Sequence, residues 1–239
     1  MSQSSANDLF LRALQTSPFA IDRKRLAAQQ IYEDLRERII ALELKPGTGL
    51  SRPALTEFYR VSQTPIRDAI LKLEQEGLVE IYPQSKTLVA RIDVANAKET
   101  QFLRTAIELE VARALALDGD KMKVAPARRL LDQQREALGR GDFARFIQLD
   151  RQFHASLAEA AGHAGLWDLI RRRSGHLDRL RQLHLPSPGK GQAIMADHQE
   201  ILAAIDSGKE DAARKAVRKH LSGTLQAIDQ IVAKYPGYF

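Results

Sequence analysis

Apolar residues recur at helical spacing from about residue 24. They lie three or four positions apart and so share one face of an amphipathic helix: Ala28, Ile31, Leu35, Ile39 and Leu42. We expect Pro46-Gly47 to end this helix. Before it, residues 1–25 are poorly patterned, and we expect a frayed N-terminal arm there.

Two shorter helices are predicted next. The first begins after Ser51, a plausible N-cap, and a tight turn over residues 59–61 follows it. Ser62 is the N-cap candidate of the second, which carries Pro65 in its first turn, where a missing N–H costs nothing. Gly77 is a natural residue just beyond its C-terminus.

After Gly77 the spacing of apolar residues changes from the helical period to the two-residue period of β-strands. Residues 78–82 and 87–92 alternate as two strands, and the polar segment 83–86 reads as the turn between them. Helix, short helix, tight turn, helix and hairpin is the order of a winged helix-turn-helix. In this motif the second helix of the turn lies in the DNA major groove. A small helical domain used for protein contacts is the alternative.

The rest of the chain has an Ala/Leu-rich helical pattern with few breaks. We expect six helices that form an antiparallel bundle, over residues 95–118, 123–139, 142–161, 165–186, 191–206 and 209–234. The predicted fold is therefore mainly α: a winged-helix domain with a two-stranded β wing over 26–92, and an all-helical domain over 93–239.

Composition narrows the function classes. The 239 residues contain no cysteine, which excludes disulfides, thiolate metal sites and cysteine nucleophiles. No GxGxxG or GxxxxGK[ST] loop occurs. No apolar run approaches the ~18–20 residues that span a bilayer, and no signal peptide is evident. The net charge of +6 favours an anionic partner such as nucleic acid.

Four polar residues interrupt the apolar faces of three predicted helices. Asp150 and His154 are spaced i, i+4 on one helix, and His198 and His220 lie on the apolar faces of two later ones. A buried carboxylate must be paired, hydrogen-bonded or metal-bound. Imidazole with carboxylate is suited to a first-row divalent metal. Hydrogen-bonded core histidines are the alternative.

The first domain resembles the DNA-binding head of GntR-family transcriptional regulators. The similar segments are LRERII (35–40), LKPG (44–47), VSQTPIRDAI (61–70) and LEQEGLV (73–79). The resemblance implies an operator contact through the third helix and the wing, with the residues Ser62, Gln63, Thr64, Arg67 and Lys86 as candidates.

Three positions depart from the family pattern. Gln63 replaces a usual Arg, Pro53 stands where many members place another DNA-contacting Arg, and Lys86 replaces the Gly of the wing. The family's typical operator sequence is therefore not carried over to this chain. Lys86 and Arg60 are extra cations that would compensate through phosphate contacts.

The second domain is similar to the FCD effector domain of the FadR-like branch, VanR-like six-helix subgroup. The segments are FLRTAIE (102–108), DRQFH (150–154), HQEILAAI (198–205) and RKHL (218–221). The resemblance implies a divalent metal (zinc, nickel or manganese) held by Asp150, His154, His198 and His220. It also implies a small-carboxylate effector bound by Arg104, with Arg179 and Arg181 of second rank. A surface Arg104–Glu108 ion pair is the alternative.

Together these features predict a cytoplasmic, metabolite-responsive transcriptional regulator, a repressor in its usual sense, and not an enzyme. It would bind an inverted-repeat operator in double-stranded DNA as a homodimer. One alternative is a DNA-binding dimer whose helical domain does not sense a ligand. The other is a metal-dependent hydrolase or lyase, for which no general base is evident beside the Asp/His cluster.

Overall fold

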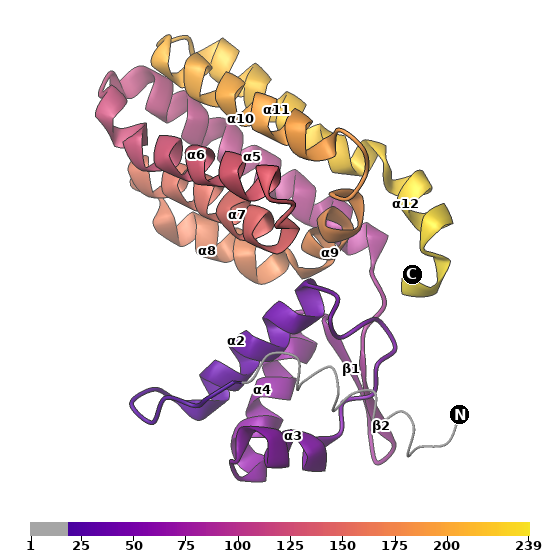
Figure 1. Ribbon diagram of the computed structural model, residues 1–239. Helices are drawn as coiled ribbons and strands as arrows, with labels where there is room; N and C mark the ends of the chain where they lie inside the picture. The colour runs from indigo at the N-terminus through magenta and orange to yellow at the C-terminus, as the bar shows by residue number, and fades with distance from the viewer. Residues whose placement is uncertain (1–18) are drawn as a thin grey trace. The chain divides into compact units, whose positions relative to one another are not determined.

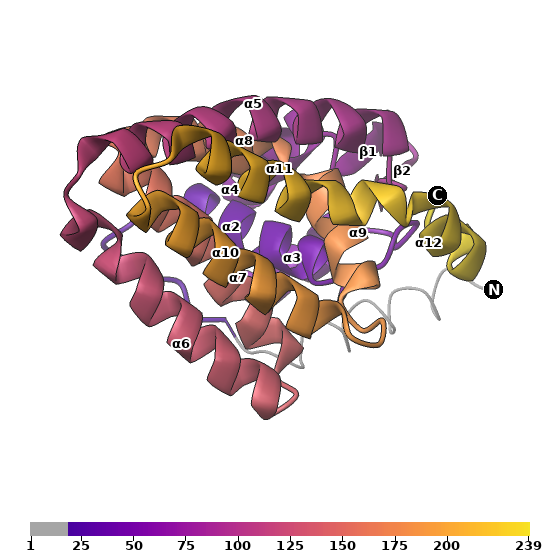
Figure 2. The same ribbon diagram turned by 90° about the horizontal axis from the view of Figure 1, so that it is seen from above.

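The computed structural model describes residues 19–239, which form two compact units (Figures 1 and 2). The first unit consists of the described residues up to Val94 together with Val232–Phe239, and the second is Ala95–Ile231. The division along the chain thus falls two residues after the one expected at 92/93. The last eight residues belong to the first unit, whereas the sequence analysis placed them in the second domain, 93–239. Residues 1–18 of the expected arm lie outside the described part.

The first unit is a winged helix-turn-helix, as the order of the sequence patterns predicted. Its elements are α2 (Ala27–Ile40), α3 (Arg52–Tyr59), α4 (Gln63–Gln75), β1 (Val79–Tyr82) and β2 (Lys86–Val89). The strands pair antiparallel, with Val79 opposite Val89 and Tyr82 opposite Lys86. Both strands are shorter than expected: β1 begins one residue later, at Val79, and β2 runs from Lys86 to Val89 and so ends three residues before the expected end.

Local chemistry explains most of the boundaries. The Ser51 side chain accepts a hydrogen bond from the backbone N–H of Ala54 and so caps α3. Ser62 holds the N-cap position of α4 without a capping side-chain bond. The prediction for α2 was wrong at its end: the helix stops at Ile40, well before Pro46, because Leu42 adopts a left-handed backbone with φ 62°.

A continuous apolar core joins the three helices to the wing. Its fully buried members are Ile31, Leu35, Ile39, Leu44, Leu55, Ile66, Ala69, Ile70, Leu73 and Leu78. Phe19 packs edge-to-face on Tyr59 with ring centroids 5.7 Å apart, so this end of the expected arm is held against the core and is not frayed.

The second unit is an all-helical bundle. Its elements are α5 (Val94–Asp118), η1 (Lys121–Val124), α6 (Ala125–Gly139), α7 (Phe143–Ala160), α8 (Ala164–Arg173), α9 (Gly175–His184), α10 (Lys190–Asp206) and α11 (Glu210–Gln226). Helix α12 (Ile228–Lys234) begins in this unit, whereas its last residues and the short helix η2 (Pro236–Tyr238) belong to the first unit. Two expected helices are each divided in two. Span 165–186 breaks at Ser174, and span 209–234 breaks at Ala227.

The long helices of this unit lie side by side, with α6 along α7 and α10 along α11 (Figure 2). Their shared apolar core includes Phe146, Phe153, Ile201 and Val217. Within this core lies a group of buried polar side chains from several helices. Among the described residues, no helix combines the length and apolarity needed to cross a membrane.

Candidate metal centre and DNA-contacting surface

Asp150, His154, His198 and His220 meet inside the helical bundle. One ligand atom from each lies within 4.8 Å of those of all the others. Asp150 and His154 come from successive turns of α7, whereas His198 comes from α10 and His220 from α11. The spacing predicted the shared face of the first two, and the packing of α7, α10 and α11 brings the other two to it.

The three imidazoles direct their Nε2 atoms at one another. His198 Nε2 lies 3.3 Å from His220 Nε2, which lies 3.2 Å from His154 Nε2. A tetrahedral ion with metal–nitrogen bonds of ~2.0–2.1 Å separates its ligand atoms by ~3.3–3.4 Å. Asp150 Oδ1 is 3.6 Å from His198 Nε2 and is buried without a hydrogen-bonding partner among the described residues. This donor set therefore fits a first-row divalent metal.

An oxygen atom faces the Nδ1 of each imidazole. Glu108 Oε2 on α5 lies 2.7 Å from His154, Gln134 Oε1 on α6 lies 3.0 Å from His198, and Asp197 Oδ2 on α10 lies 3.6 Å from His220. Gln134 Oε1 is within hydrogen-bonding distance of His198 Nδ1, favours the tautomer with its proton there and so leaves the His198 Nε2 lone pair free. Nδ1 of His154 and Nδ1 of His220 face a carboxylate oxygen but make no hydrogen bond of ordinary geometry among the described residues. In that tautomer the His198 lone pair faces the Nε2 atoms of the other two histidines, and a cation bound between them would offset the repulsion between their lone pairs.

Burial favours the neutral imidazoles that metal binding needs. It lowers the pKa of His154 to about 4, despite the nearby Glu108 carboxylate. It also lowers the pKa of His198 well below its usual value. At neutral pH both rings are therefore uncharged and able to donate a lone pair.

Asp150 stays ionised through an ion pair on its other oxygen. Burial acts to raise its pKa, but the Arg181 guanidinium holds that pKa well below its usual range. Arg181 pairs with Asp150 Oδ2 and, at 3.4 Å, with Asp178. Arg181, expected to bind an effector, is thus engaged by a carboxylate of the cluster itself.

Arg104 forms the i, i+4 ion pair with Glu108 that was the alternative to an effector contact, although the pair is buried and not on the surface. Its Nη2 atom is also buried and has no hydrogen-bonding partner among the described residues. Arg179 is fully buried, contacts the Gly175 carbonyl and His176, and has its pKa lowered by burial to about 10. Each of the three arginines is thus engaged by a group of the bundle itself.

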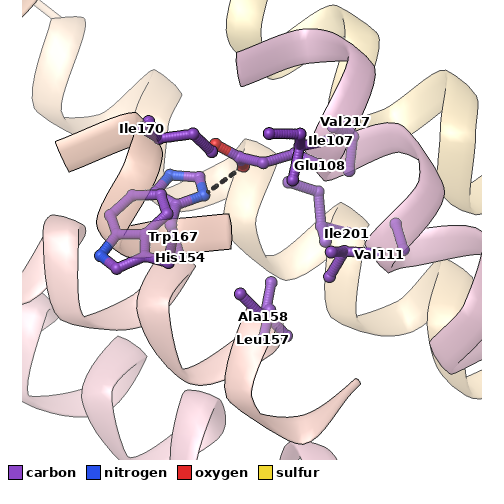
Figure 3. A pocket seen from close by; sticks show the side chains of 11 residues that line it. Ile107, Glu108, Val111, His154, Leu157, Ala158, Trp167, Ile170, Ile201 and Val217 are labelled. Atoms are coloured by element: carbon purple, nitrogen blue, oxygen red, sulfur yellow. Dashed lines mark ion pairs between the residues drawn. The ribbon is translucent and has the colours of Figure 1, made fainter. Parts of the chain in front are cut away.

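A cavity of about 10 Å³ lies beside the Glu108–His154 contact (Figure 3). Trp167, stacked on His154 with ring centroids 6.0 Å apart, forms part of its wall. Most of the remaining lining is aliphatic: Ile107, Val111, Leu157, Ile170, Ile201 and Val217. The volume suffices for about one water molecule and is far below the roughly 300–1,000 Å³ of small-molecule sites.

The predicted DNA-contacting residues lie on the surface of the winged-helix unit. Ser62, Gln63, Thr64 and Arg67 are exposed at the N-terminal end of α4, and Lys86 is exposed at the start of β2. Gln63, Arg67 and Lys86 line one groove between α4 and the wing, with a volume of about 1180 Å³. The Lys86 ammonium lies 5.1 Å from the Tyr82 ring centroid.

Sequence reasoning overlooked Arg52 and Gln134. Arg52 is exposed in the same groove, immediately before the Pro53 that replaces a family arginine. Gln134 interrupts the apolar face that Ala127, Leu131 and Leu138 form on α6. The signal that identified the four cluster residues, a polar side chain on an apolar face, was therefore also present for Gln134.

Comparisons with known proteins agree with this architecture. Residues 27–89 match the family of bacterial regulatory proteins named gntR, and residues 99–223 match the FCD domain. The chain is 37% identical over 216 residues to an HTH-type transcriptional regulator in an unstable DNA locus of Streptomyces ambofaciens, covering 90% of each chain. It is 31% identical to the transcriptional repressor RspR of Escherichia coli K12, covering 88% of this chain and 92% of that one.

The fold is similar to that of McbR/YncC of E. coli, with a TM-score of 0.72 at 22% identity, over 87% of this chain and 98% of the other. The two matched domains and the two relatives above 30% identity agree with the resemblance noted from the sequence segments. The chain therefore belongs to the GntR family and is a DNA-binding transcriptional regulator with an FCD domain, not an enzyme.

Proposed function

We propose that this regulator represses transcription as a homodimer, in the cytoplasm, and senses a small carboxylate through a divalent metal in its FCD domain. The observation that carries the proposal is the convergence of Asp150 with three imidazole Nε2 atoms in a buried core. Asp150 and the three histidines would hold the ion, and the ion would supply an electrophilic point of attachment for a carboxylate.

Arg104 supports the carboxylate class of the effector. Its buried Nη2 lacks a partner among the described residues, and a guanidinium matches a carboxylate in a bidentate fashion. A carboxylate that pairs with Arg104 would compete with Glu108, which in turn contacts His154. The effector would thereby act on the surroundings of the metal centre.

The small cavity favours a sensor that changes conformation. At about 10 Å³ it has no room for a carboxylate ligand, so binding requires Trp167 or its aliphatic neighbours to move. A ligand that binds such an opened form more tightly shifts the population toward it, which is the requirement for regulation.

Exposed cations on the winged-helix unit support operator contact by α4 and the wing. Arg52, Arg67 and Lys86 line one groove, and none of the three has an ion pair among the described residues. Gln63 and Arg67 would read base edges, and Ser62, Thr64 and Lys86 would hold phosphates. The repressor RspR, at 31% identity, supports the repressor mode.

The test combines selection and titration. Selection from randomised DNA duplexes with the untagged protein would yield an operator, which we expect to be an inverted repeat bound by two chains. Small carboxylates, with and without added zinc, nickel or manganese, are then titrated into the complex and followed by fluorescence anisotropy. Release of DNA by a carboxylate only in the metal-loaded protein supports the proposal. Equal DNA affinity under all these conditions contradicts the sensing part.

A further inference from the structure

Gln134 lies beside the candidate metal centre on a helix that contributes none of its four residues. It is fully buried on α6, on the helix face that also buries Ala127 and Leu131. Its Oε1 lies 3.0 Å from His198 Nδ1. A polar side chain at such a position needs an explanation, because an apolar residue there would pack without desolvating an amide.

The Gln134 amide is only half satisfied. Its Nε2 is buried and has no hydrogen-bonding partner among the described residues. A buried donor without a partner reduces stability, so the side chain is a poor choice for the fold alone. Gln30 in the winged-helix unit is a useful contrast: it is also buried, and its amide makes three hydrogen bonds, to Asp22 and Arg25.

The contact with His198 indicates what the Gln134 amide does: it selects one tautomer of the imidazole. Oε1 accepts a hydrogen bond and cannot donate one, so it stabilises the His198 tautomer whose proton is on Nδ1. Phe153 stacks on the His198 ring, with centroids 4.1 Å apart and planes within 15°, and fixes the plane in which the ring turns. With the plane and the tautomer both fixed, the Nε2 lone pair faces the Nε2 atoms of the other two histidines.

We propose that Gln134 is a positioning residue, which holds His198 in the Nδ1-protonated tautomer so that its Nε2 is available to a divalent cation. This inference rests on the proposed metal centre. Gln134 places a neutral oxygen beside Nδ1 of His198, whereas Glu108 places a charged carboxylate beside Nδ1 of His154, so Gln134 adds no charge to the core. Oxygen partners of this kind typically change metal affinity by about 10- to 100-fold when they are removed.

The experiment compares the full chain carrying Gln134→Leu, Gln134→Glu or Gln30→Leu with the unmodified protein. Nitrogen-15 NMR of the metal-free proteins reports the His198 tautomer, assigned with His198→Ala. Competition with a chromogenic chelator reports zinc affinity, and thermal unfolding of the metal-free proteins reports stability.

For Gln134→Leu we expect a mixed His198 tautomer, zinc affinity about 10- to 100-fold lower, and an unchanged or higher unfolding midpoint. Gln134→Glu keeps the acceptor and should restore the tautomer, with zinc affinity within a few-fold of the unmodified protein. Gln30→Leu should lower the unfolding midpoint and leave zinc affinity unchanged, which separates stability from metal binding.

Two results would overturn the inference: a His198 tautomer that Gln134→Leu leaves unchanged, or zinc affinity equal to that of the unmodified protein despite a changed tautomer. The metal centre itself can fail separately. If the unmodified protein binds no zinc, nickel or manganese, the role of Gln134 toward a cation falls with the metal centre. The NMR result would then still decide whether Gln134 sets the tautomer.

Discussion

Glu108 Oε2 lies 2.7 Å from Nδ1 of His154 and so connects helix α5 to the candidate metal centre on α7. The other oxygen of the same carboxylate pairs with Arg104. A chain of three side chains therefore joins the arginine expected to bind an effector to a residue expected to bind a metal. Any change in the pairing of Arg104 therefore alters the electrostatic potential at His154.

Removing Arg104 should destabilise the helical unit strongly. The Arg104→Ala variant leaves the Glu108 carboxylate buried without its guanidinium, and breaking a buried pair in this way costs about 3–5 kcal/mol. Urea unfolding of the metal-free protein measures the free energy of unfolding. Arg135→Ala removes an exposed arginine paired with Asp132 and should cost less than about 1 kcal/mol. Equal losses in the two variants would mean that burial of the Arg104 pair is energetically unimportant.

The double variant His198→Ala/His220→Ala should lose bound metal. It removes two of four ligand atoms, and the other two, on α7, cannot complete the coordination of a zinc-like ion. Elemental analysis of the untagged protein should give about one metal per chain, absent in the variant, while operator binding without effector persists. His163→Ala, an exposed histidine outside the cluster, is the control and should keep its metal. Metal retained in the double variant would show that the ligand set is different.

Arg67→Ala should weaken operator binding and relax specificity at one base pair. Arg67 is exposed on α4 in the groove beside the wing, and a bidentate arginine–guanine contact is worth about 1–3 kcal/mol of discrimination. Fluorescence anisotropy with the selected operator and its single-base variants measures both effects. Arg140→Ala, an exposed arginine of the FCD domain, should change neither. An unchanged affinity of Arg67→Ala would remove Arg67 from the DNA-contacting set.

Arg52→Ala and Lys86→Ala should each weaken binding about equally for all DNA sequences. Both side chains are exposed cations in the same groove, and Arg52 adjoins the Pro53 that stands in place of a family arginine. Loss of one phosphate contact should reduce the slope of log affinity against log salt by about 1. Titrations at several salt concentrations measure that slope. A slope equal to that of the unmodified protein would mean that the replaced side chain does not reach phosphate.

Local sequence patterns predicted the order and type of most elements of both domains. Helical periodicity between residues 24 and 75 and the strand pattern after Gly77 predicted the winged helix, because each signal depends on residues a few positions apart. The same patterns misplaced the end of α2, where the left-handed backbone of Leu42 has no sequence signal, and missed the break at Ser174.

The candidate site was only partly contained in the sequence. Polar residues on apolar helix faces identified Asp150, His154, His198 and His220, because a buried polar group is costly wherever the helix packs. Only the packing of α7, α10 and α11 decided that their ligand atoms lie within 4.8 Å of one another. The oxygen atoms at each Nδ1 and the pairing of Arg104 depend equally on packing. Distances between helices far apart in the chain follow from how all side chains fill the core together, and no local period encodes them.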